Sequence, residues 1–187
     1  MGALEAYGYL RSCTDTDDAF VYDVFATTWE SQVAALPNPN LAQHVLRIQH
    51  IAQERRFAAR FPGHERYIIV EHGEPAGRLY VQDTGTVLHV VDLTLLPRFR
   101  SRGIGSRVVR DLCAYADLHQ RTVSLRVGRP NDQATGLYAS HGFNLVAVDD
   151  LDNYFEWVPP SVKEAAVKEG PSAVKEAGVK ESSHSLP

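Results

Sequence analysis

The residues with the clearest chemical potential form a basic, glycine-containing turn, Arg100-Ser101-Arg102-Gly103-Ile104-Gly105-Ser106. The two glycines carry no side chain that would keep an anion away from the backbone N–H groups. Arg100 and Arg102 add positive charge beside those amides. Helical periodicity follows, so the turn lies at a helix N-terminus, where free N–H groups and the helix dipole attract anions. The sequence therefore predicts a site for a di- or polyphosphate.

Two other phosphate-binding loops do not fit this turn. A P-loop ends in Gly-Lys-Ser or Gly-Lys-Thr, a combination that the sequence lacks. A dinucleotide-binding loop needs a third glycine where Val108 stands. It also needs an acidic residue about 20 positions further on, where the next strand offers Arg126. Taken alone, the turn is also compatible with an ordinary strand–turn–helix that happens to be basic.

The turn connects an expected strand to an expected helix. An apolar run at 87–96 precedes it and indicates a strand. Behind it, apolar residues recur at spacings of four, four and three on one helical face: Ile104, Val108, Leu112 and Tyr115. A strand at 122–127 follows this helix of about 104–119, which favours a right-handed parallel crossover.

The remaining pattern predicts a mixed sheet with helices on both of its faces. The expected strands are 7–13, 66–71, 76–82, 87–96, 122–127, 143–148 and 153–158. The expected helices are about 17–29, 41–60, 104–119 and 132–141. Asn40 and Asn131 can cap the second and the last helix, and Gly142 can end the last one. The connections between 66 and 96 are too short for crossovers, so these strands must pair antiparallel.

Composition and charge are those of an ordinary soluble globular protein. The formal net charge is −4, which argues against nucleic acid or an anionic membrane as a partner. No apolar run approaches the roughly 18–20 residues of a membrane-spanning helix, and the N-terminus lacks the features of a signal peptide. Cys13 and Cys113 have no metal-like spacing and lie in apolar patterns, which predicts buried free thiols. We therefore expect a cytoplasmic protein without a metal site.

Two motifs at the right separation resemble the core of the GCN5-related N-acetyltransferase (GNAT) family. The strand ends in Asp92-Leu93-Thr94-Leu95-Leu96-Pro97, close to that family's strand-then-proline approach to its loop. The loop Arg100-x-x-Gly103-x-Gly105 is similar to the family's acyl-CoA diphosphate loop. Asn131 followed by Leu137-Tyr138-x-x-x-Gly142-Phe143 is similar to its second motif. The resemblance extends from about Ala76 to Phe155, and the order of elements before it also agrees.

The resemblance implies a GNAT-type α/β fold with a mixed, mostly antiparallel sheet of six to seven strands and a central β-α-β unit. It implies acetyl-CoA as acetyl donor and direct transfer to an amine in a ternary complex. In the family, two parallel strands part at a β-bulge and admit the pantetheine arm. We expect this near Leu93–Leu95, opposite Ser124–Val127. The expected cofactor-binding residues are Leu93, Thr94, Leu95, Arg100, Ser101, Arg102, Gly103, Ile104, Gly105, Ser106, Asn131 and Tyr138.

Tyr138 is the candidate for the general acid. A phenol with a pKa near 10 is close enough to a thiol of about 8.5 to donate a proton to the leaving sulfur of CoA. In the family, a tyrosine at this position reaches that sulfur. The alternative is that Tyr138 is a core aromatic residue on the helix face with Ala134 and Leu137.

The general base is less clearly marked. His89 and Asp92 both lie on the strand that leads into the turn. Three residues apart, they point to opposite faces unless a bulge intervenes. His89 has the better-matched pKa. A water relay is the third possibility, and Asp92 could instead cap backbone near the bulge.

The acceptor is not identified by the sequence. Small polyamines, aminoglycosides, amino acids and protein N-termini all fit. In the family, the acceptor site is built by the first two helices with their linker and by the last strands, here Trp29–Asn40 and Asp149–Tyr154. The acidic residues Asp149, Asp150 and Asp152 could attract a cationic amine or simply form a solvated hairpin turn.

Two functions of other classes also fit parts of the sequence. One is a nucleotide- or dinucleotide-binding module that uses the same turn, which the antiparallel strands and the second motif oppose. The other is a non-catalytic acyl-CoA-binding regulator. A monomer and a homodimer are both compatible with the sequence.

The C-terminal segment differs in composition from everything before it. Val-Lys-Glu recurs at 162–164, 167–169, 174–176 and 179–181 with balanced charge and no helical face. The sequence therefore predicts a catalytic domain at 1–158 and a flexible low-complexity tail at 159–187.

Overall fold

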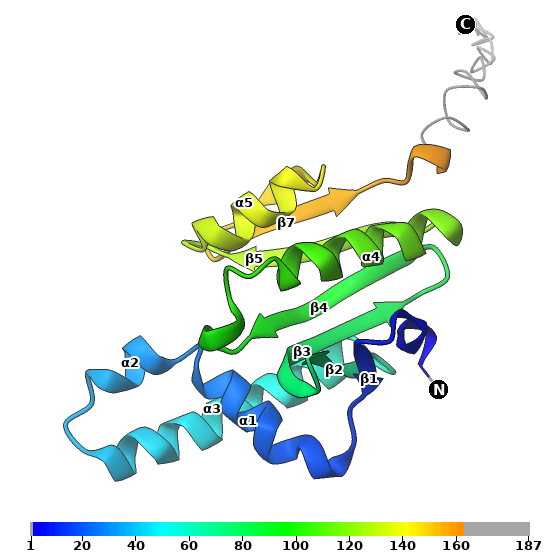
Figure 1. Cartoon of the computed structure of the whole chain (residues 1–187). Coiled ribbons are helices and arrows are strands. Elements are labelled where there is room, and N and C mark those ends of the chain that lie inside the picture. Colours follow the sequence, from blue (N-terminus) through cyan, green and yellow to red (C-terminus); the bar gives the residue numbers. More distant parts are fainter. Residues whose placement is uncertain (1, 163–187) are drawn as a thin grey trace, which may run out of the picture.

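A seven-stranded sheet forms the centre of the structure, a computed structural model that describes residues 2–162 (Figure 1). The strand order is β1-β2-β3-β4-β5-β7-β6. Only β4 and β5 are parallel, and all other neighbouring strands are antiparallel. The strands are β1 (Leu10–Ser12), β2 (Glu65–Glu71), β3 (Glu74–Asp83), β4 (Val87–Leu95), β5 (Thr122–Gly128), β6 (Asn144–Val148) and β7 (Asp152–Trp157).

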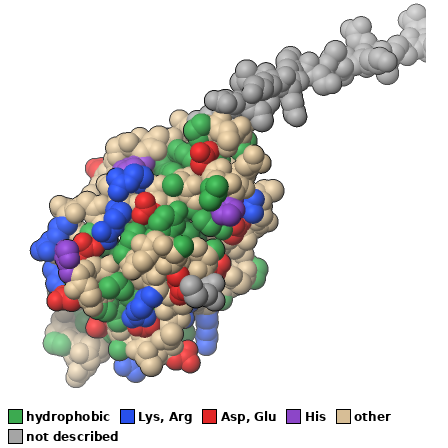
Figure 2. All heavy atoms as spheres, turned by 45° about the vertical axis from the view of Figure 1, so that its right-hand side comes forward, with side chains coloured by type: hydrophobic (Ala, Val, Ile, Leu, Met, Phe, Trp, Pro, Cys, Tyr) green, Lys and Arg blue, Asp and Glu red, His purple; other side chains and the backbone are tan. Residues whose placement is uncertain are grey.

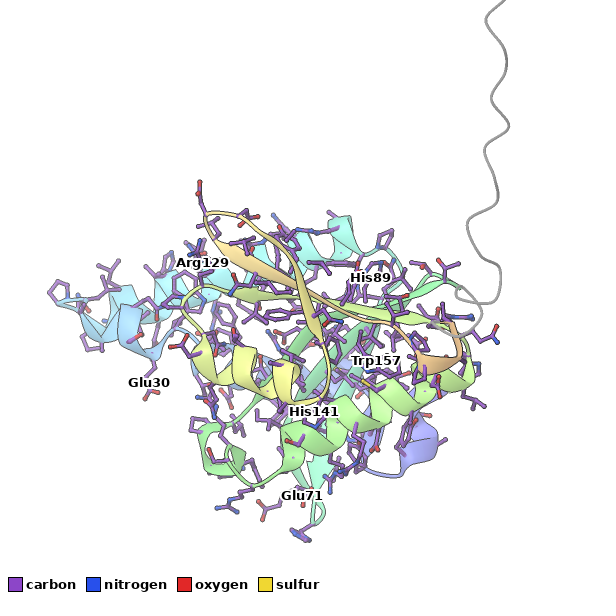
Figure 3. All side chains as sticks on the ribbon, turned by 90° about the horizontal axis from the view of Figure 1, so that it is seen from above. Glu30, Glu71, His89, Arg129, His141 and Trp157 are labelled. Atoms are coloured by element: carbon purple, nitrogen blue, oxygen red, sulfur yellow. The ribbon has the colours of Figure 1, made fainter. Side chains whose placement is uncertain are left out.

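Helices cover both faces of this sheet, as the sequence predicts. One face carries α4 and α5, whereas α3 lies across the other (Figures 1 and 3). The helices are α1 (Asp18–Ala26), α2 (Glu30–Ala34), α3 (Pro39–Arg60), α4 (Ile104–Leu118) and α5 (Asp132–Ser140). On the face shown in Figure 2, basic and acidic side chains are interspersed among hydrophobic ones.

The main core lies between the sheet and α4. The spacing of apolar residues on α4 gives it one buried face: Ile104, Val108, Leu112 and Ala116 are at most 3% exposed. β4, α4 and β5 form the only parallel crossover among the described strands. The packing of the buried face of α4 on the sheet fixes the position of the turn that precedes α4. A smaller cluster on the opposite face joins α1 and α3 to the sheet through Val21, Phe57, Ile68 and Tyr80.

A β-bulge interrupts β4 near its middle. Tyr80 of β3 pairs with Asp92, but the next residue, Val81, pairs with Val90, so Val91 has no partner in β3. One extra residue reverses the alternation of side chains across the sheet. The bulge lies slightly before the predicted position at 93–95.

The pairing of β4 with β5 ends at this bulge. It extends only from Val87 and Thr122 to Val90 and Leu125. Beyond that point, β4 pairs only with β3, and β5 pairs only with β7. The two parallel strands therefore part toward their C-terminal ends, as expected opposite 124–127.

A buried arginine ties the bulge to α3. The Arg78 side chain on β3 is 1% exposed. Its Nε donates to Asp92 at 2.7 Å, and its terminal nitrogens donate to Gln53 at 2.7 Å and to Glu54 at 3.3 Å. The guanidinium also lies over the Tyr80 ring, 5.1 Å from the ring centroid. A buried charge is tolerated only with such partners.

Several local features differ from the sequence-based expectation. The first strand is only Leu10–Ser12, because Ala3–Tyr7 forms a 3-10 helix. Asn38, rather than Asn40, caps α3: its side chain accepts from the Asn40 backbone, and Pro39 occupies the first helical position. The short helix α2 was not predicted.

Other expectations concern the cysteines and the C-terminal segment. Both cysteines are free thiols, but only Cys113 is buried, since Cys13 is partly exposed. The predicted tail at 159–187 lies outside the described residues after position 162. None of the helices in the described part of the chain combines the length and hydropathy needed to cross a membrane.

Replacing Arg78 with Met should strongly destabilise the fold. The substitution leaves the carboxylates of Asp92 and Glu54 without their buried cation, which typically costs about 3–5 kcal/mol. Urea denaturation would measure the loss. Arg121→Met is the matched control, because Arg121 pairs with Asp83 at the surface (3.0 Å) and such pairs contribute about 0–1 kcal/mol. Equal losses in the two variants would contradict a special role for Arg78.

Candidate active site

A cavity of about 640 Å³ lies where the basic turn, the end of β4 and α5 meet. We call it the loop cavity. All the predicted cofactor-binding residues line it except Arg102 and Ile104. The Arg102 side chain is exposed, and the Ile104 side chain is buried in the core. The structure thus brings together two motifs that are about thirty residues apart in the sequence.

The backbone of the turn offers a row of hydrogen-bond donors. Ser101 (φ 56°) and Gly103 (φ 79°) both adopt left-handed conformations before α4 begins. Among residues 2–162, no group accepts a hydrogen bond from the backbone N–H groups of 101–106, and the first helical bond runs from Arg107 to Gly103. Together with the positive end of the helix dipole, these amides can bind an anion.

Gly103 is the residue that keeps this turn open. A Cβ at this position would meet no atom within 4 Å, so it would project into open space. The positive φ also disfavours any residue with a side chain. Glycine therefore suits this backbone conformation and leaves open space beside the turn.

Arg100 has a second role in this structure. Its Nε donates to the Leu95 carbonyl at 2.8 Å, and its Nη2 donates to the Thr27 hydroxyl at 3.1 Å. The side chain therefore ties the turn to the end of β4 and to the end of α1, while it also lines the cavity. Thr27 and the adjacent Thr28 line the cavity as well, and no sequence signal marked them.

The exposed edge of β4 forms another wall of the loop cavity. Leu93, Thr94 and Leu95 line it beyond the point where β5 has departed. Backbone groups on this edge have no strand partner on the β5 side. Such an edge can hydrogen-bond an extended chain that carries amides.

Asn131 acts as a helix cap at the far side of the loop cavity. Its side-chain oxygen accepts from the Ala134 backbone at 3.0 Å, as the sequence predicts. This bond fixes the start of α5, which carries Tyr138.

Tyr138 is held by aromatic neighbours, and its hydroxyl has no partner. Its ring packs against Phe143 and Phe155, with centroids 5.4 and 6.4 Å away. Within residues 2–162 the hydroxyl makes no hydrogen bond, and the residue lines the loop cavity. Burial raises the pKa of the phenol above its ordinary value, and the negative charge of Asp92 adds to this shift. The group therefore stays protonated at neutral pH, and the shift widens the difference from the thiol pKa of about 8.5 on which the sequence-based assignment relied.

A second cavity of about 580 Å³ lies on the opposite face of the sheet, beneath α3. We call it the α3 cavity. Its walls come from the C-terminal part of α3 and from β4 to β7. It includes Val90 and Leu125, the last residues paired between β4 and β5. The loop cavity is lined by Leu93–Leu95, just beyond Val90 on β4, so the two cavities lie on opposite faces near the point where β4 and β5 part.

His89 lies in the α3 cavity and not in the loop cavity (Figure 3). Its Nδ1 is 2.5 Å from the hydroxyl of Ser124 on β5, and its ring lies 5.7 Å from that of Phe61. Burial lowers the pKa of His89, the positive charge of Arg60 acts in the same direction, and Glu156 opposes both. The imidazole is therefore neutral at neutral pH, as a base must be.

The bulge places Asp92 on the same face as His89. Asp92 lies opposite Tyr80, which faces α3, and His89 lines the cavity beneath α3. However, the Asp92 carboxylate accepts from the Arg78 guanidinium and from the Thr94 hydroxyl. These bonds hold it against β3, so of the two predicted bases His89 is the better placed.

The acidic hairpin between β6 and β7 is largely engaged in its own structure. Asp149 accepts from the Tyr154 hydroxyl and from the backbone amides of Leu151 and Asp152. The hydrogen bonds lower the pKa of Asp149. Asp152 pairs with Arg126 at 3.1 Å. These two carboxylates therefore do not form a vacant site for a cationic amine.

Comparison with known proteins identifies the family and the fold. The sequence model of the acetyltransferase (GNAT) family matches residues 21–143. No curated protein matches the sequence. The PaiA N-acetyltransferase from Thermoplasma acidophilum, solved with coenzyme A, has a TM-score of 0.60 at 15% identity, over 80% of this chain and 97% of that chain.

Two further solved structures share the fold. The ribosomal-protein-S18-alanine N-acetyltransferase from Escherichia coli has a TM-score of 0.55 at 19% identity, over 80% of this chain and 92% of that chain. The spermidine N-acetyltransferase from Vibrio cholerae, solved with CoA and spermine, has a TM-score of 0.54 at 12% identity, over 80% of this chain and 94% of that chain.

Replacing Gly103 with Val should abolish the binding of acetyl-CoA, the predicted cofactor, in calorimetry. The new side chain would occupy the open space in front of the amides, and the positive φ would add about 1–3 kcal/mol of strain. Gly85→Val is the matched control, because Gly85 also has a positive φ (90°) and open surroundings but lies in the turn between β3 and β4. Unchanged affinity in folded Gly103→Val would show that the turn does not hold the cofactor.

Proposed function

This chain belongs to the acetyltransferase (GNAT) family, and we propose that it transfers the acetyl group of acetyl-CoA directly to a primary amine. The observation that carries the proposal is the joint placement of the turn at 101–106 and the unpaired edge of β4 in one cavity. The backbone amides of the turn suit a diphosphate, and the edge of β4 suits the amides of a pantetheine arm.

The residues present fit this cofactor. The backbone amides of 101–106 would hold the diphosphate, with Gly103 leaving the space that it needs. The β4 edge at Leu93–Leu95 would align the arm toward the opening between β4 and β5. When bound, acetyl-CoA supplies an acetyl group activated as a thioester.

Tyr138 is the proposed general acid. Tyr138 lines the loop cavity, and its hydroxyl has no hydrogen-bond partner within the described residues. The phenol is protonated at neutral pH and can donate its proton as negative charge develops on the leaving sulfur. The aromatic packing of the ring fixes the direction of the hydroxyl without engaging it.

His89 is the proposed general base on the other side of the opening. It faces the α3 cavity, from which we propose the amine approaches. Neutral imidazole can take the proton that the amine loses as its nitrogen attacks. A C–N bond then replaces the C–S bond, and the products are an N-acetylated amine and CoA, whose thiol carries the proton given by Tyr138.

The function is tested by measuring free CoA after mixing the protein, acetyl-CoA and a panel of amines. We expect release that depends on the amine, with an acetylated product of matching stoichiometry by mass spectrometry. Binding of acetyl-CoA without amine-dependent release from any amine in the panel would support the non-catalytic regulator instead.

Tyr138→Phe should lower kcat by roughly 10²–10⁴-fold, the usual contribution of a general acid. Affinity for acetyl-CoA and the free energy of unfolding should change little, because the hydroxyl has no partner in the ground state. Because the pKa of Tyr138 is raised, the alkaline limb of the pH–rate profile that it sets should lie above the ordinary tyrosine value of 10, and this limb should disappear in the variant. Tyr115→Phe, which removes a hydroxyl on α4 outside both cavities, should leave kcat unchanged. Near-normal turnover in Tyr138→Phe would make Tyr138 a packing residue.

His89→Gln should remove the acidic limb of the same profile. Because the pKa of His89 is lowered, the wild-type limb should lie below the ordinary histidine value of 6.5. Activity is lost as pH falls through that pKa, since protonated imidazole cannot accept a proton. The exposed His44→Gln variant should retain the limb. If the limb persists in His89→Gln, water rather than His89 is the base.

A further inference from the structure

Two arginines of α3 give the α3 cavity a positive end. Arg56 and Arg60 are one helical turn apart, so both lie on the same face of the helix, and both line the cavity. Both side chains are exposed, so an incoming anion need not displace a buried partner. Among residues 2–162, neither guanidinium has a carboxylate or hydrogen-bond partner, and the Arg60 guanidinium lies over the Phe61 ring, 5.5 Å from the ring centroid.

The other charged residues that line the α3 cavity are Arg126, Asp152 and Glu156. Arg126 is neutralised by Asp152 at 3.1 Å. Glu156 lies opposite Ser124 in the pairing of β7 with β5, and Ser124 is in turn bonded to His89. Glu156 has no ion-pair partner within the described residues, so the unpaired negative charge lies at the His89 end of the α3 cavity. The unpaired positive charges, Arg56 and Arg60, lie on α3.

Arg60 is connected to the proposed base through one aromatic ring. Its guanidinium lies over Phe61, and the same ring is 5.7 Å from the imidazole of His89. An acceptor whose amine reaches His89 can therefore place a second group, a few bonds away, against α3.

Resting on the proposed function, we propose that the acceptor is a small amine that also carries a carboxylate or a phosphate, and that Arg56 and Arg60 bind this anionic group. Guanidinium groups recognise carboxylates and phosphates through paired charge-assisted hydrogen bonds. The amine end faces Glu156 and His89, and the anionic end faces α3. A dicationic amine would instead place its second charge beside two arginines.

Calorimetry on the CoA-saturated protein tests this preference without turnover. The probes are 4-aminobutyrate, 3-aminopropyl phosphate, the neutral isostere 4-aminobutanamide and 1,4-diaminobutane. The two anionic probes should bind about 10- to 100-fold more tightly than the amide, the scale of a charge-assisted contact. Their relative affinities distinguish a carboxylate from a phosphate ligand.

The variant Arg56→Gln/Arg60→Gln should reduce the affinity of the anionic probes to that of the amide and leave the amide unchanged. Arg55→Gln, on the same helix but outside the cavity, is the control and should bind like the wild type. The inference is overturned if the anionic probes do not bind, if the amide or the diamine binds as tightly, or if the double variant keeps the preference.

The CoA-release assay separates this inference from the proposed function. Turnover of the neutral amide or the diamine, with no preference for anionic amines, overturns the inference and leaves the function standing. Tight binding of the anionic probes without release of CoA from any amine overturns the function and leaves the anion site standing.

Discussion

β4 and β5 are hydrogen-bonded only as far as Val90 and Leu125, and the rest of the site depends on this early end of their pairing. A continuous sheet would separate the face that carries α4 and α5 from the face that carries α3. Because the strands part, the proposed thioester donor on one face and the proposed amine acceptor on the other can meet in the opening. The same departure leaves one edge of β4 without a strand partner, and that edge can supply hydrogen bonds to an extended ligand.

The bulge at Val91 and the buried charge of Arg78 determine which side chains flank the opening. The extra residue brings His89 and Asp92 onto one face, and Arg78 then draws the Asp92 carboxylate toward β3 and α3. This leaves His89 as the proposed base on the α3 side of the opening. Opposite it, Tyr138 reaches the loop cavity from α5. The acid and the base of the proposed reaction therefore sit on opposite faces, where the leaving sulfur and the attacking nitrogen respectively would be.

Local features of the site could be predicted from the sequence, and long-range ones could not. The turn at 100–106 and the helix behind it follow from glycine placement and apolar spacing, which act over a few residues. The bulge lies at Val91 rather than at 93–95, because register is set by contacts with β3 that no local pattern encodes. Arg56 and Arg60 fit a helix C-terminus in the sequence, and only the packing of α3 over β4 shows that they line a cavity.

Hydrogen–deuterium exchange with and without saturating acetyl-CoA tests the central claim most directly, that the cofactor occupies the opening between the turn and β4. The account predicts slower exchange at the backbone amides of 101–106 and along 91–95, and little change in β1 and β2, which lie at the far edge of the sheet. Slower exchange confined to other segments, with no effect at 101–106, would contradict it.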